Sequence, residues 1–307
     1  MADIASRVPV TWSARVKRVR TVPGAEFVIT LVTEKPLGAI GGFIVLAMVV
    51  AAVFANVIAP YPFAETHFSD ALSSPGGSYV LGTDNLGRDL LSRIIFGARI
   101  SIYVALGAVG LGMIYALALG LAAAWFGGFV DTAIATFIDA KLAIPTLLLT
   151  LVVAGVLGPG VGNTILVLSL FGINEARVVR GYALSVRQGL FVEAATATGA
   201  GSLRIILTHL LPNVFPMMVI LASLRFGAVI IAEATLSFLG YGVPPPNPSW
   251  GGMLSHEARY YMQEAPWLAI VPGLSLTLAV WGFNTFGDAL RDMLDPRMRG
   301  SDGMRYK

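Results

Sequence analysis

The stretch LGAIGGFIVLAMVVAAVFANVI, residues 37–58, decides what kind of protein this chain is. It contains no charged residue, and a helix of about 20 apolar residues crosses the roughly 30 Å hydrocarbon core of a bilayer. Pro60 and Pro62 follow it and end the helix. The stretch is too long for the core of a signal peptide, and no small-residue cleavage site follows it. We therefore expect a retained membrane-spanning helix.

Five further apolar stretches follow along the chain, at residues 101–126, 134–157, 163–179, 213–236 and 267–286. Of the 307 residues, 56% are hydrophobic and 13% are charged, whereas an average soluble domain carries about a quarter charged residues. Lipid must therefore cover much of the surface. The sequence predicts an all-α, polytopic membrane protein with six transmembrane helices. The start of the third transmembrane helix is hard to define, because it contains the charged residues Asp131, Asp139 and Lys141. The side chain of Lys141 is expected to extend toward the membrane interface.

The distribution of basic residues predicts that both termini are cytoplasmic, because Lys and Arg gather on that side of a membrane. With the N-terminus inside, the cytoplasmic side holds Arg7, Arg15, Lys17, Arg18, Arg20 and Lys35, then Arg177, Arg180, Arg187 and Arg204, and finally Arg291, Arg297, Arg299, Arg305 and Lys307. The outer side holds Arg88, Arg93, Arg99 and Arg259.

This orientation divides the chain into five parts. Residues 1–36 form a cytoplasmic segment, 37–58 the first transmembrane helix, and 59–100 an extracytoplasmic segment. Residues 101–290 form a transmembrane core that includes a cytoplasmic loop at 181–212. Residues 291–307 form a cytoplasmic tail.

Several classes of chemistry are excluded by composition. There is no cysteine, and the three histidines lie far apart without the spacing of metal ligands, so no metal site is expected. No lysine stands in a Gly-Lys-Ser/Thr phosphate loop, and neither a GxSxG nor an HExxH motif occurs. The chain is therefore expected neither to hydrolyse ATP nor to act as an enzyme. Its net charge of +3 gives no reason to expect a nucleic-acid partner.

The outer segment ends in a helical pattern. Apolar residues recur every four positions at Leu86, Leu90 and Ile94. Thr83 or Asp84 can cap the helix, and Asp89 with Arg93 makes a favourable i,i+4 pair. An amphipathic helix on the outer face is predicted.

The cytoplasmic loop predicts two short helices separated by glycine. The apolar face of the first is formed by Val186, Leu190, Ala194 and Ala197. It stops at Gly199-Ala200-Gly201, where glycine permits the positive φ of a helix end. Ser202 can cap the second, whose stripe is Leu203, Ile206 or Leu207, and Leu210. Pro212 begins the next span. Such a shelf suits docking into a groove on a cytoplasmic partner.

These residues carry a resemblance. Glu193-Ala194-Ala195, then Gly199, then Leu211-Pro212 resembles the EAA loop of binding-protein-dependent ABC importer permeases. The resemblance implies that the loop forms the coupling helix, which fits into a separate ATPase subunit. His209 stands where the general pattern has isoleucine, which is typical of the peptide and nickel branch.

Further motifs are similar to those of the second, C-type permease of dipeptide and oligopeptide importers. The outer motif consists of Gly82, Thr83, Asp84, Gly87, Arg88, Asp89 and Arg93. The end of the fifth span, residues 233–240, and residues 248–251 also match. The closing motif consists of Asn284, Gly287, Asp288, Arg291, Asp292, Asp295 and Pro296. Thr136 and Ile173 depart from the branch, which commonly has arginine and tryptophan there.

The resemblance implies a subunit that forms half of a pathway for di- or oligopeptides in the inner membrane and binds no cofactor itself. Its implied partners are a related permease, two ATPase subunits that bind ATP and magnesium, an extracytoplasmic binding protein and the lipid bilayer. Importers of nickel–chelate or glutathione are alternatives within the class. A self-sufficient secondary transporter is another, although it would need intramembrane acids or internal repeats.

Charged residues near the spans carry the remaining hypotheses. Arg225 falls midway along the fifth span, where a charge costs at least about 2.5 kcal/mol. It is interpreted as lining the translocation path together with Glu233, or else as paired internally with Glu233 or Asp139. Glu193 is interpreted as a contact to the ATPase. The closing motif is read either as a solvated, self-paired helix end or as a contact with a partner subunit. The outer motif is read as packing or as a contact with the binding protein.

Overall fold

The computed structural model describes residues 25–255 and 257–294, and the regular structure in that part of the chain is helical. In the described residues, extended backbone is paired at two isolated β-bridges, Gly76 with Tyr79 and Thr83 with Asp89. The predicted all-α class is confirmed. The α-helices are α1 (Ala25–Glu34), α2 (Pro36–Val53), α3 (Ala55–Ile58), α4 (Leu90–Phe126), α5 (Gly128–Leu142), α6 (Thr146–Leu157), α7 (Val161–Ser169), α8 (Ala176–Arg187), α9 (Leu190–Ala197), α10 (Ser202–Ile205), α11 (Leu211–Phe238), α12 (Trp250–Ser255), α13 (Glu257–Tyr261) and α14 (Trp267–Leu294). Short 3-10 segments η1 (Phe68–Asp70) and η2 (Leu170–Glu175) and a π-helical turn η3 (Ile206–Leu210) complete the set.

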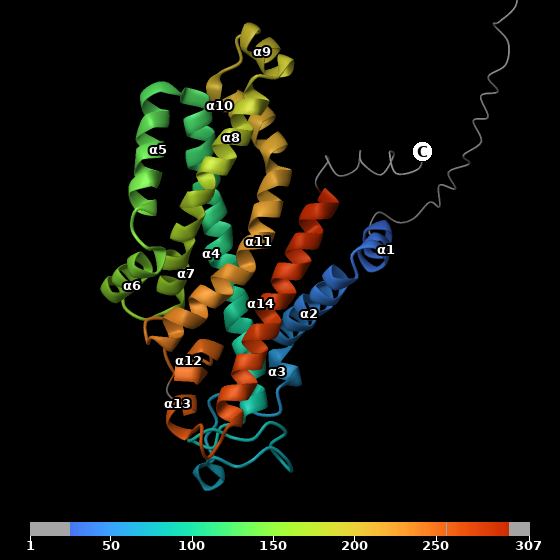
Figure 1. The fold of residues 1–307 in the computed structure, drawn as a ribbon, viewed down its shortest axis with the longest axis vertical. Coiled ribbons are helices and arrows are strands. Elements are labelled where there is room, and N and C mark those ends of the chain that lie inside the picture. The colour runs from blue at the N-terminus through green and yellow to red at the C-terminus, as the bar shows by residue number, and fades with distance from the viewer. Residues whose placement is uncertain (1–24, 256, 295–307) are drawn as a thin grey trace, which may run out of the picture.

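The long helices run side by side along the long axis of the molecule (Figure 1). α4 lies at the centre, with α2, α7, α8 and α11 packed against it. α14 packs between α2 and α11. At one end lie α9 and α10, and at the other lies the segment that joins α3 to α4. The two ends of the molecule are therefore built by different parts of the chain.

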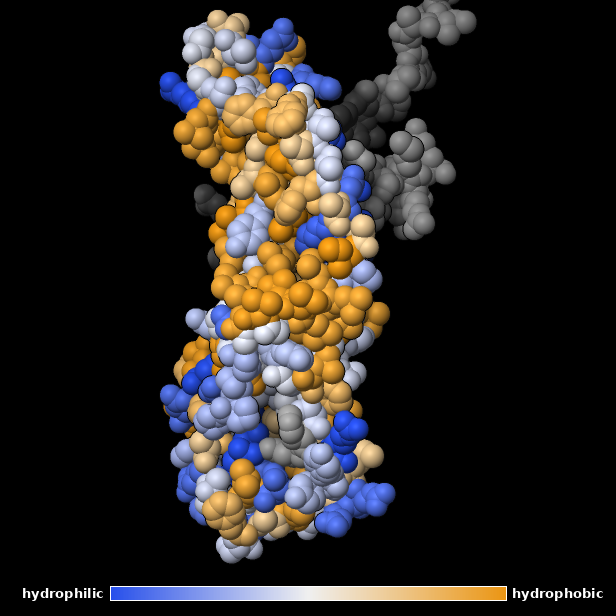
Figure 2. Space-filling model, turned by 90° about the vertical axis from the view of Figure 1, so that its left-hand side faces the viewer, coloured by the Kyte–Doolittle hydropathy of each residue, from blue (hydrophilic) through white to orange (hydrophobic). Residues whose placement is uncertain are grey.

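The surface follows the same axis. Figure 2 shows a hydrophobic band around the middle of one face, with hydrophilic residues gathered toward both ends. Large apolar side chains are exposed on α2, such as Phe43 at 71%, and on α6, such as Val156 at 83%. Side chains of this kind are stable in lipid or against another membrane protein, and water would oppose their exposure.

The helices that can cross a membrane correspond to most of the predicted spans. Within the described residues four are long and apolar enough: α2, α4, the continuous run 202–238, and α14. The pair α5 and α6, bent by 90° between the two helices, makes a fifth when it is counted as one span. The fourth predicted span, 163–179, is instead divided among α7, η2 and the start of α8. The predicted number of six is therefore not confirmed, because charged residues and backbone breaks interrupt two of the segments.

The predicted outer helix begins later in the structure than the sequence indicates, so the predicted start is wrong. Residues 84–89 form a loop, and α4 begins at Leu90 with Asp89 as its N-cap, whose carboxylate accepts from Ser92 N at 2.8 Å. α4 then runs without a break for 37 residues into the second predicted span. Thr83 and Asp84 satisfy the same capping preference in sequence, but the fold uses both for other bonds.

Small residues set the distance between the packed helices. A Cβ at Gly38 would overlap the side chain of Ala289, and one at Gly41 would overlap Thr285 Oγ1. On the other side of α14, a Cβ at Gly227 of α11 would overlap Asn284 Oδ1. Close backbone approach at small residues is a principal source of helix association in lipid, since burial of apolar surface contributes little there.

This packing predicts that Gly41→Ala destabilises the protein. The added methyl forces α2 away from α14, and overpacking of this kind costs about 1–3 kcal/mol. Gly110→Ala is the matched control, because a Cβ at Gly110 of α4 meets no atom within 4 Å. Thermal unfolding of both variants in mild detergent tests the prediction. Gly41→Ala should lower the midpoint while Gly110→Ala leaves it unchanged or raises it, and equal midpoints would contradict the packing.

Candidate functional site

The first candidate site is the shelf at one end of the molecule, formed by α9, α10 and residues 198–201. Gly199 adopts a φ of +82°, as the sequence predicts for the end of the first helix. The amide of Ala200 then donates to Ala195 O at 3.1 Å and closes the turn. Gly201 is the N-cap of α10, and no side chain caps that helix, so the predicted cap by Ser202 is wrong. Val186 belongs to α8, because the chain breaks at Gln188 and Gly189 before α9 begins.

One face of α9 anchors the shelf and another face is open. Val192 is 3% exposed, and Phe191 contacts the ring of His209 in η3 with 6.1 Å between ring centroids. Glu193 and Ala194 are exposed, Ala195 is half-buried, and Leu190 is 82% exposed. The shelf therefore presents a carboxylate surrounded by small and apolar side chains.

Leu211 and Pro212 connect the shelf to the membrane helix. α10, η3 and α11 form one continuous run, and Pro212 lies in the first turn of α11 as predicted. Leu210 is completely buried at the base of the run. A displacement of the shelf would therefore be transmitted to α11 through a helix and not through a loose linker.

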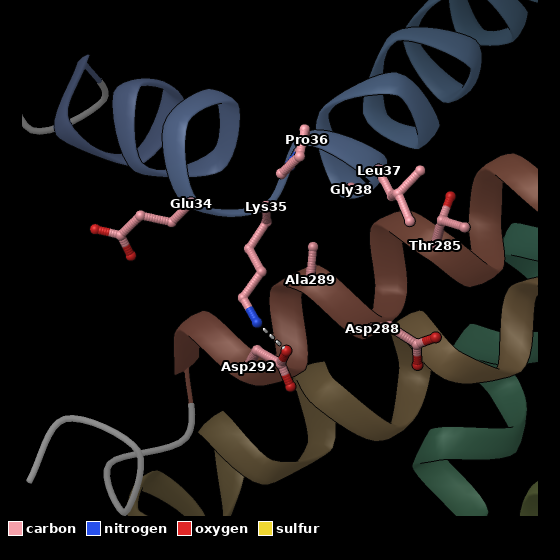
Figure 3. A pocket seen from close by; sticks show the side chains of 9 residues that line it. All are labelled: Glu34, Lys35, Pro36, Leu37, Gly38, Thr285, Asp288, Ala289 and Asp292. Atoms are coloured by element: carbon pink, nitrogen blue, oxygen red, sulfur yellow. Dashed lines mark hydrogen bonds and ion pairs between the residues drawn. The ribbon is translucent and has the colours of Figure 1, made fainter. Parts of the chain in front are cut away.

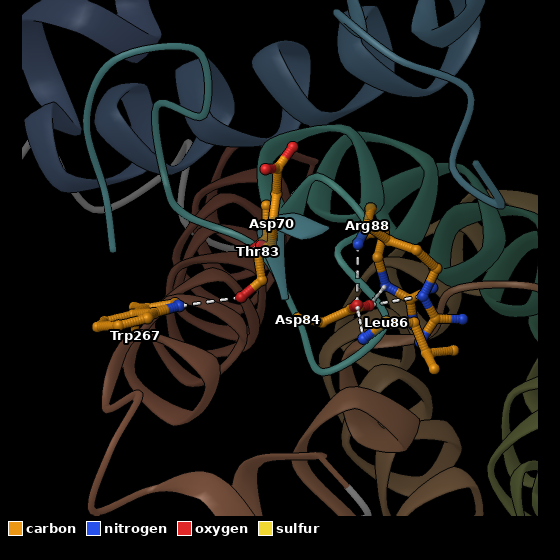
Figure 4. A network of polar contacts seen from close by, with 7 residues as sticks. Asp70, Thr83, Asp84, Leu86, Arg88 and Trp267 are labelled. Atoms are coloured by element: carbon orange, nitrogen blue, oxygen red, sulfur yellow. Dashed lines mark hydrogen bonds and ion pairs between the residues drawn. The ribbon is translucent and has the colours of Figure 1, made fainter. Parts of the chain in front are cut away.

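The second candidate site is the outer motif, which forms a buried polar network at the opposite end (Figure 4). Asp84 is fully buried; its carboxylate accepts from Leu86 N at 2.8 Å, Arg88 N at 3.0 Å and Arg88 Nε at 2.6 Å. Arg93 Nε lies 3.4 Å from the same carboxylate. Asp89 lies beside this network and caps α4, where its carboxylate accepts from Ser92 N at 2.8 Å.

Thr83 joins this network to two distant segments. Its hydroxyl donates to Asp70 O and accepts from Ser73 N, and its carbonyl accepts from Trp267 Nε1 of α14 at 3.1 Å (Figure 4). Asp70 in turn accepts a hydrogen bond from Tyr79, which raises the pKa of the Tyr79 hydroxyl to about 12. The outer segment is thus fixed to the bundle by buried polar contacts.

Two glycines of the motif permit this fold. Gly82 and Gly87 have φ values of +81° and +73°. A Cβ at Gly87 would overlap the backbone of His67. Glycine is the residue that adopts such a conformation without strain at so close an approach.

The structure also brings the outer motif together with the end of the fifth predicted span. Arg88 and Arg93 line one side of a cavity of about 340 Å³, and Ser237 and Gly240 line it from the end of α11. Ser237 accepts from Val243 N at 3.1 Å and donates to Glu233 at 2.7 Å. Ser237 therefore joins α11 to the loop that follows, while Glu233, which is only 1% exposed, supports Ser237 from inside the bundle.

The third candidate site is the charged group midway along the helices. Arg225 of α11 pairs with Glu175 at the end of η2, and Asp139 pairs with Arg177. The predicted internal partners of Arg225, Glu233 and Asp139, are therefore both wrong. Lys141 Nζ donates to Asn174 Oδ1 at 2.9 Å beside this group. Arg225 remains 32% exposed, whereas Glu175 is almost completely enclosed.

The closing motif joins the first and last membrane helices. Lys35, the N-cap residue of α2, lies 2.5 Å from Asp292 of α14 (Figure 3). Asp288 lies one turn earlier on α14, and it lines with Lys35 and Asp292 the pocket drawn in Figure 3. The self-paired helix end predicted for Asp292 is wrong, because its partner is on another helix. Asn284 and Gly287 pack against α11 at Gly227 and Ser223. Arg291 is exposed, and Asp295 and Pro296 lie outside the described residues.

Comparison with known families agrees with this arrangement. The model described as binding-protein-dependent transport system inner membrane component matches residues 108–300. A second, the N-terminal TM domain of oligopeptide transport permease C, matches residues 33–75.

The chain belongs to the family of binding-protein-dependent permeases.

Individual permeases are similar over most of their length. The dipeptide transport system permease protein of Alkalihalophilus pseudofirmus is 39% identical over 267 residues, which cover 87% of this chain and 88% of the relative. The glutathione transport system permease protein of Pectobacterium atrosepticum is 40% identical over 288 residues, covering 93% and 94%. The di/tripeptide transport system permease protein of Pseudomonas aeruginosa is 38% identical over 273 residues, covering 86% and 89%.

Family membership confirms the resemblance based on the EAA loop and the outer and closing motifs. The permease is a multi-pass inner-membrane transport subunit of an ABC importer and not an enzyme, and the family has no cofactor of its own. Within the described residues no group of three His, Cys, Asp or Glu side chains could hold a metal ion.

Sequence reasoning missed several contacts of the permease, among them Phe191 with His209, Lys35 with Asp292, and Lys141 with Asn174. The last two join residues 257 and 33 positions apart, so no local spacing indicates them. His209 departs from the general pattern of the EAA loop, and this departure is the one signal in the sequence that points to its contact with Phe191.

The outer network predicts that Asp84→Asn destabilises the permease. The substitution removes the charge that Arg88 and Arg93 approach, and hydrogen bonds to a charged group are each worth about 1.5–3 kcal/mol. Glu65→Gln is the control, since Glu65 pairs with His67 at the surface and such pairs contribute at most about 1 kcal/mol. Limited proteolysis in detergent should cut residues 59–89 faster in Asp84→Asn alone. Equal cutting of both variants would show that the network does not hold the segment.

Proposed function

We propose that this permease forms half of the pathway of an ATP-driven importer for di- or oligopeptides and couples to a separate ATPase through α9. The observation that carries the proposal is the exposed face of α9. Glu193 and its neighbours Ala194 and Leu190 point away from the bundle at one end of the molecule, while Val192 anchors the helix from below. An amphipathic helix with such a face fits a groove on a partner.

The choice of peptides as substrates follows the relatives. Two of the three similar proteins named above carry dipeptide or di/tripeptide transport in their names, and the third carries glutathione, which is itself a peptide. Glutathione or nickel–chelate import is the alternative within the same mechanism. In such systems the binding protein largely determines which solute is imported. This chain would supply the path through the membrane.

The proposed assembly contains a related permease, two ATPase subunits and an extracytoplasmic binding protein. The ATPases would hold ATP and magnesium, since this sequence has no phosphate loop. The exposed apolar faces of α2 and α6 are then covered by lipid or by the second permease. Their extent supports a subunit that works inside a larger membrane complex.

We place both termini and α9 in the cytoplasm and the outer network outside. The asymmetry of basic residues supports this orientation. Residues 1–36 and 291–307 would therefore lie on the cytoplasmic side and residues 59–100 on the outer side. Residues 181–212 would form the cytoplasmic coupling loop. The rigid outer network would present a fixed surface to the binding protein. The Lys35–Asp292 contact would hold the first and last helices together at the cytoplasmic end.

We also assign Arg225 to the wall of the path. Its partial exposure at the middle of α11 supports this role, because an ionised side chain at that depth must face protein or water. Glu233 was interpreted from the sequence as lining the path together with Arg225. Its carboxyl group is enclosed between helices, so the structure gives less support to that role for Glu233 than for Arg225.

The coupling role predicts that Glu193→Arg releases the ATPase. Reversal of this charge on the exposed face opposes docking, because like charges at an interface cost several kcal/mol. The tagged permease is purified from native membranes in mild detergent, and the co-eluting proteins are identified by mass spectrometry. Glu264→Arg is the control, since it makes the same exchange at an exposed position next to the outer end of α14.

Wild type and Glu264→Arg should retain a second permease and ATPase subunits, whereas Glu193→Arg should lose the ATPases. A wild-type chain that elutes alone, yet moves solute into liposomes without ATP, would contradict the proposal and favour a secondary transporter.

A further inference from the structure

The backbone breaks at one level of the helix bundle. α5 and α6 meet at a 90° bend around residues 143–145, and η2 interrupts the next segment. The residues of the bend, Ala143 to Pro145, are exposed. Irregular backbone at membrane depth is stable only where it is covered by protein or lines a wet cavity, because lipid cannot satisfy its polar groups. This side of the subunit therefore faces a partner or a water-filled path.

Charged residues gather at the same level. Lys141 is in the last turn of α5, Asn174 and Glu175 end η2, and Arg225 is at the middle of α11. On the face that carries α5 and α6, Figure 2 shows hydrophilic residues within the hydrophobic band. In many secondary transporters, discontinuous helices near the middle of the bilayer form the substrate site, which shows that such breaks can serve solute binding.

The charges in this group do not balance. Glu175 is paired with Arg225, and Asp139 is paired with Arg177. Lys141 contacts a neutral amide, Asn174 Oδ1 at 2.9 Å, and among the described residues it forms no ion pair. One cation in excess, half-buried at this depth, is costly unless an anion compensates it.

We infer that Lys141, beside Asn174 and the Arg225–Glu175 pair, is the cation that receives the carboxylate of a solute passing along this permease. The inference rests on the proposed import of peptides, whose free C-terminus supplies that carboxylate. Arg225 already has a carboxylate partner in Glu175, so it would form part of the wall of the path and add positive charge there. Lys141 can exchange its present partner, the Asn174 amide oxygen, for a carboxylate of the solute. A lysine on a flexible stem makes such an exchange with little rearrangement of the backbone.

The test uses the complete importer, co-purified with its partners, in proteoliposomes with ATP and the binding protein. Import is measured for L-alanyl-L-phenylalanine and for the same dipeptide with a C-terminal amide. The binding protein is identical in every sample, so a change in the acid-to-amide ratio between variants reports on the permease. The variants are Lys141→Gln, Lys141→Arg and, as a control, Arg259→Gln, which removes a cation at an exposed position of α13, outside the charged group.

Lys141→Gln should lower the acid-to-amide ratio about tenfold, mainly by raising the KM for the acid, because it removes a charge-assisted hydrogen bond. Lys141→Arg and Arg259→Gln should keep the wild-type ratio. Co-purification of the partners shows whether each variant still assembles.

An unchanged ratio in an assembled Lys141→Gln importer would overturn the inference and leave the proposed function intact. A ratio that falls equally in Arg259→Gln would also overturn it, since the effect would then be general. A wild-type importer that moves neither dipeptide would contradict the proposed peptide import itself, and the inference would fall with it.

Discussion

The absence of water from the bilayer core is the constraint on which this structure depends. Backbone amides and carbonyls there must be satisfied within the protein, so the chain crosses as long helices, and helices associate by close backbone contact. Gly38 and Gly41 of α2 against α14, and Gly227 of α11 against Asn284, provide that contact. The helix bundle is therefore held by small residues at its seams, while large apolar side chains face outward.

The same constraint assigns different chemistry to the two ends and the middle. At the outer end, buried charges are stabilised because the Asp84 carboxylate lies 2.6 Å from Arg88 Nε and 3.4 Å from Arg93 Nε. At the other end, α9 carries an exposed carboxylate over an apolar base, which suits a protein partner. In the middle, irregular backbone and an unbalanced lysine occur together, where neither would be stable in contact with lipid. The proposed coupling and the proposed passage of solute would thus lie at separate levels of one subunit.

The sequence predicted the features that depend on neighbouring residues. Long apolar runs indicated the spans, Gly199 indicated a positive φ, and Pro212 indicated the start of α11. Capping was predicted less well, because Thr83, Asp84 and Asp89 all fit the rule for an N-cap. Only the wrapping of the outer segment onto α14, through Thr83 and Trp267, determines that Asp89 takes the role.

Ionic partners could not be predicted at all. Arg225 could pair with any acid near its depth, and Glu175 lies 50 residues away on a segment whose 3-10 turn has no clear sequence signal. Lys35 and Asp292 meet because α2 and α14 are neighbours, which is a property of the whole bundle. The functional motifs were found from the sequence through a family resemblance, whereas their contacts required the fold.

The central claim is that α9 and the outer network lie on opposite sides of the membrane, with α9 in the cytoplasm. The natural sequence has no cysteine, so Ser78→Cys in the outer segment and Thr198→Cys after α9 each introduce a single thiol at an exposed position. A membrane-impermeant maleimide is applied to right-side-out vesicles before and after permeabilisation. The account predicts labelling of Ser78→Cys in intact vesicles and of Thr198→Cys only after permeabilisation. Labelling of Thr198→Cys in intact vesicles would contradict it.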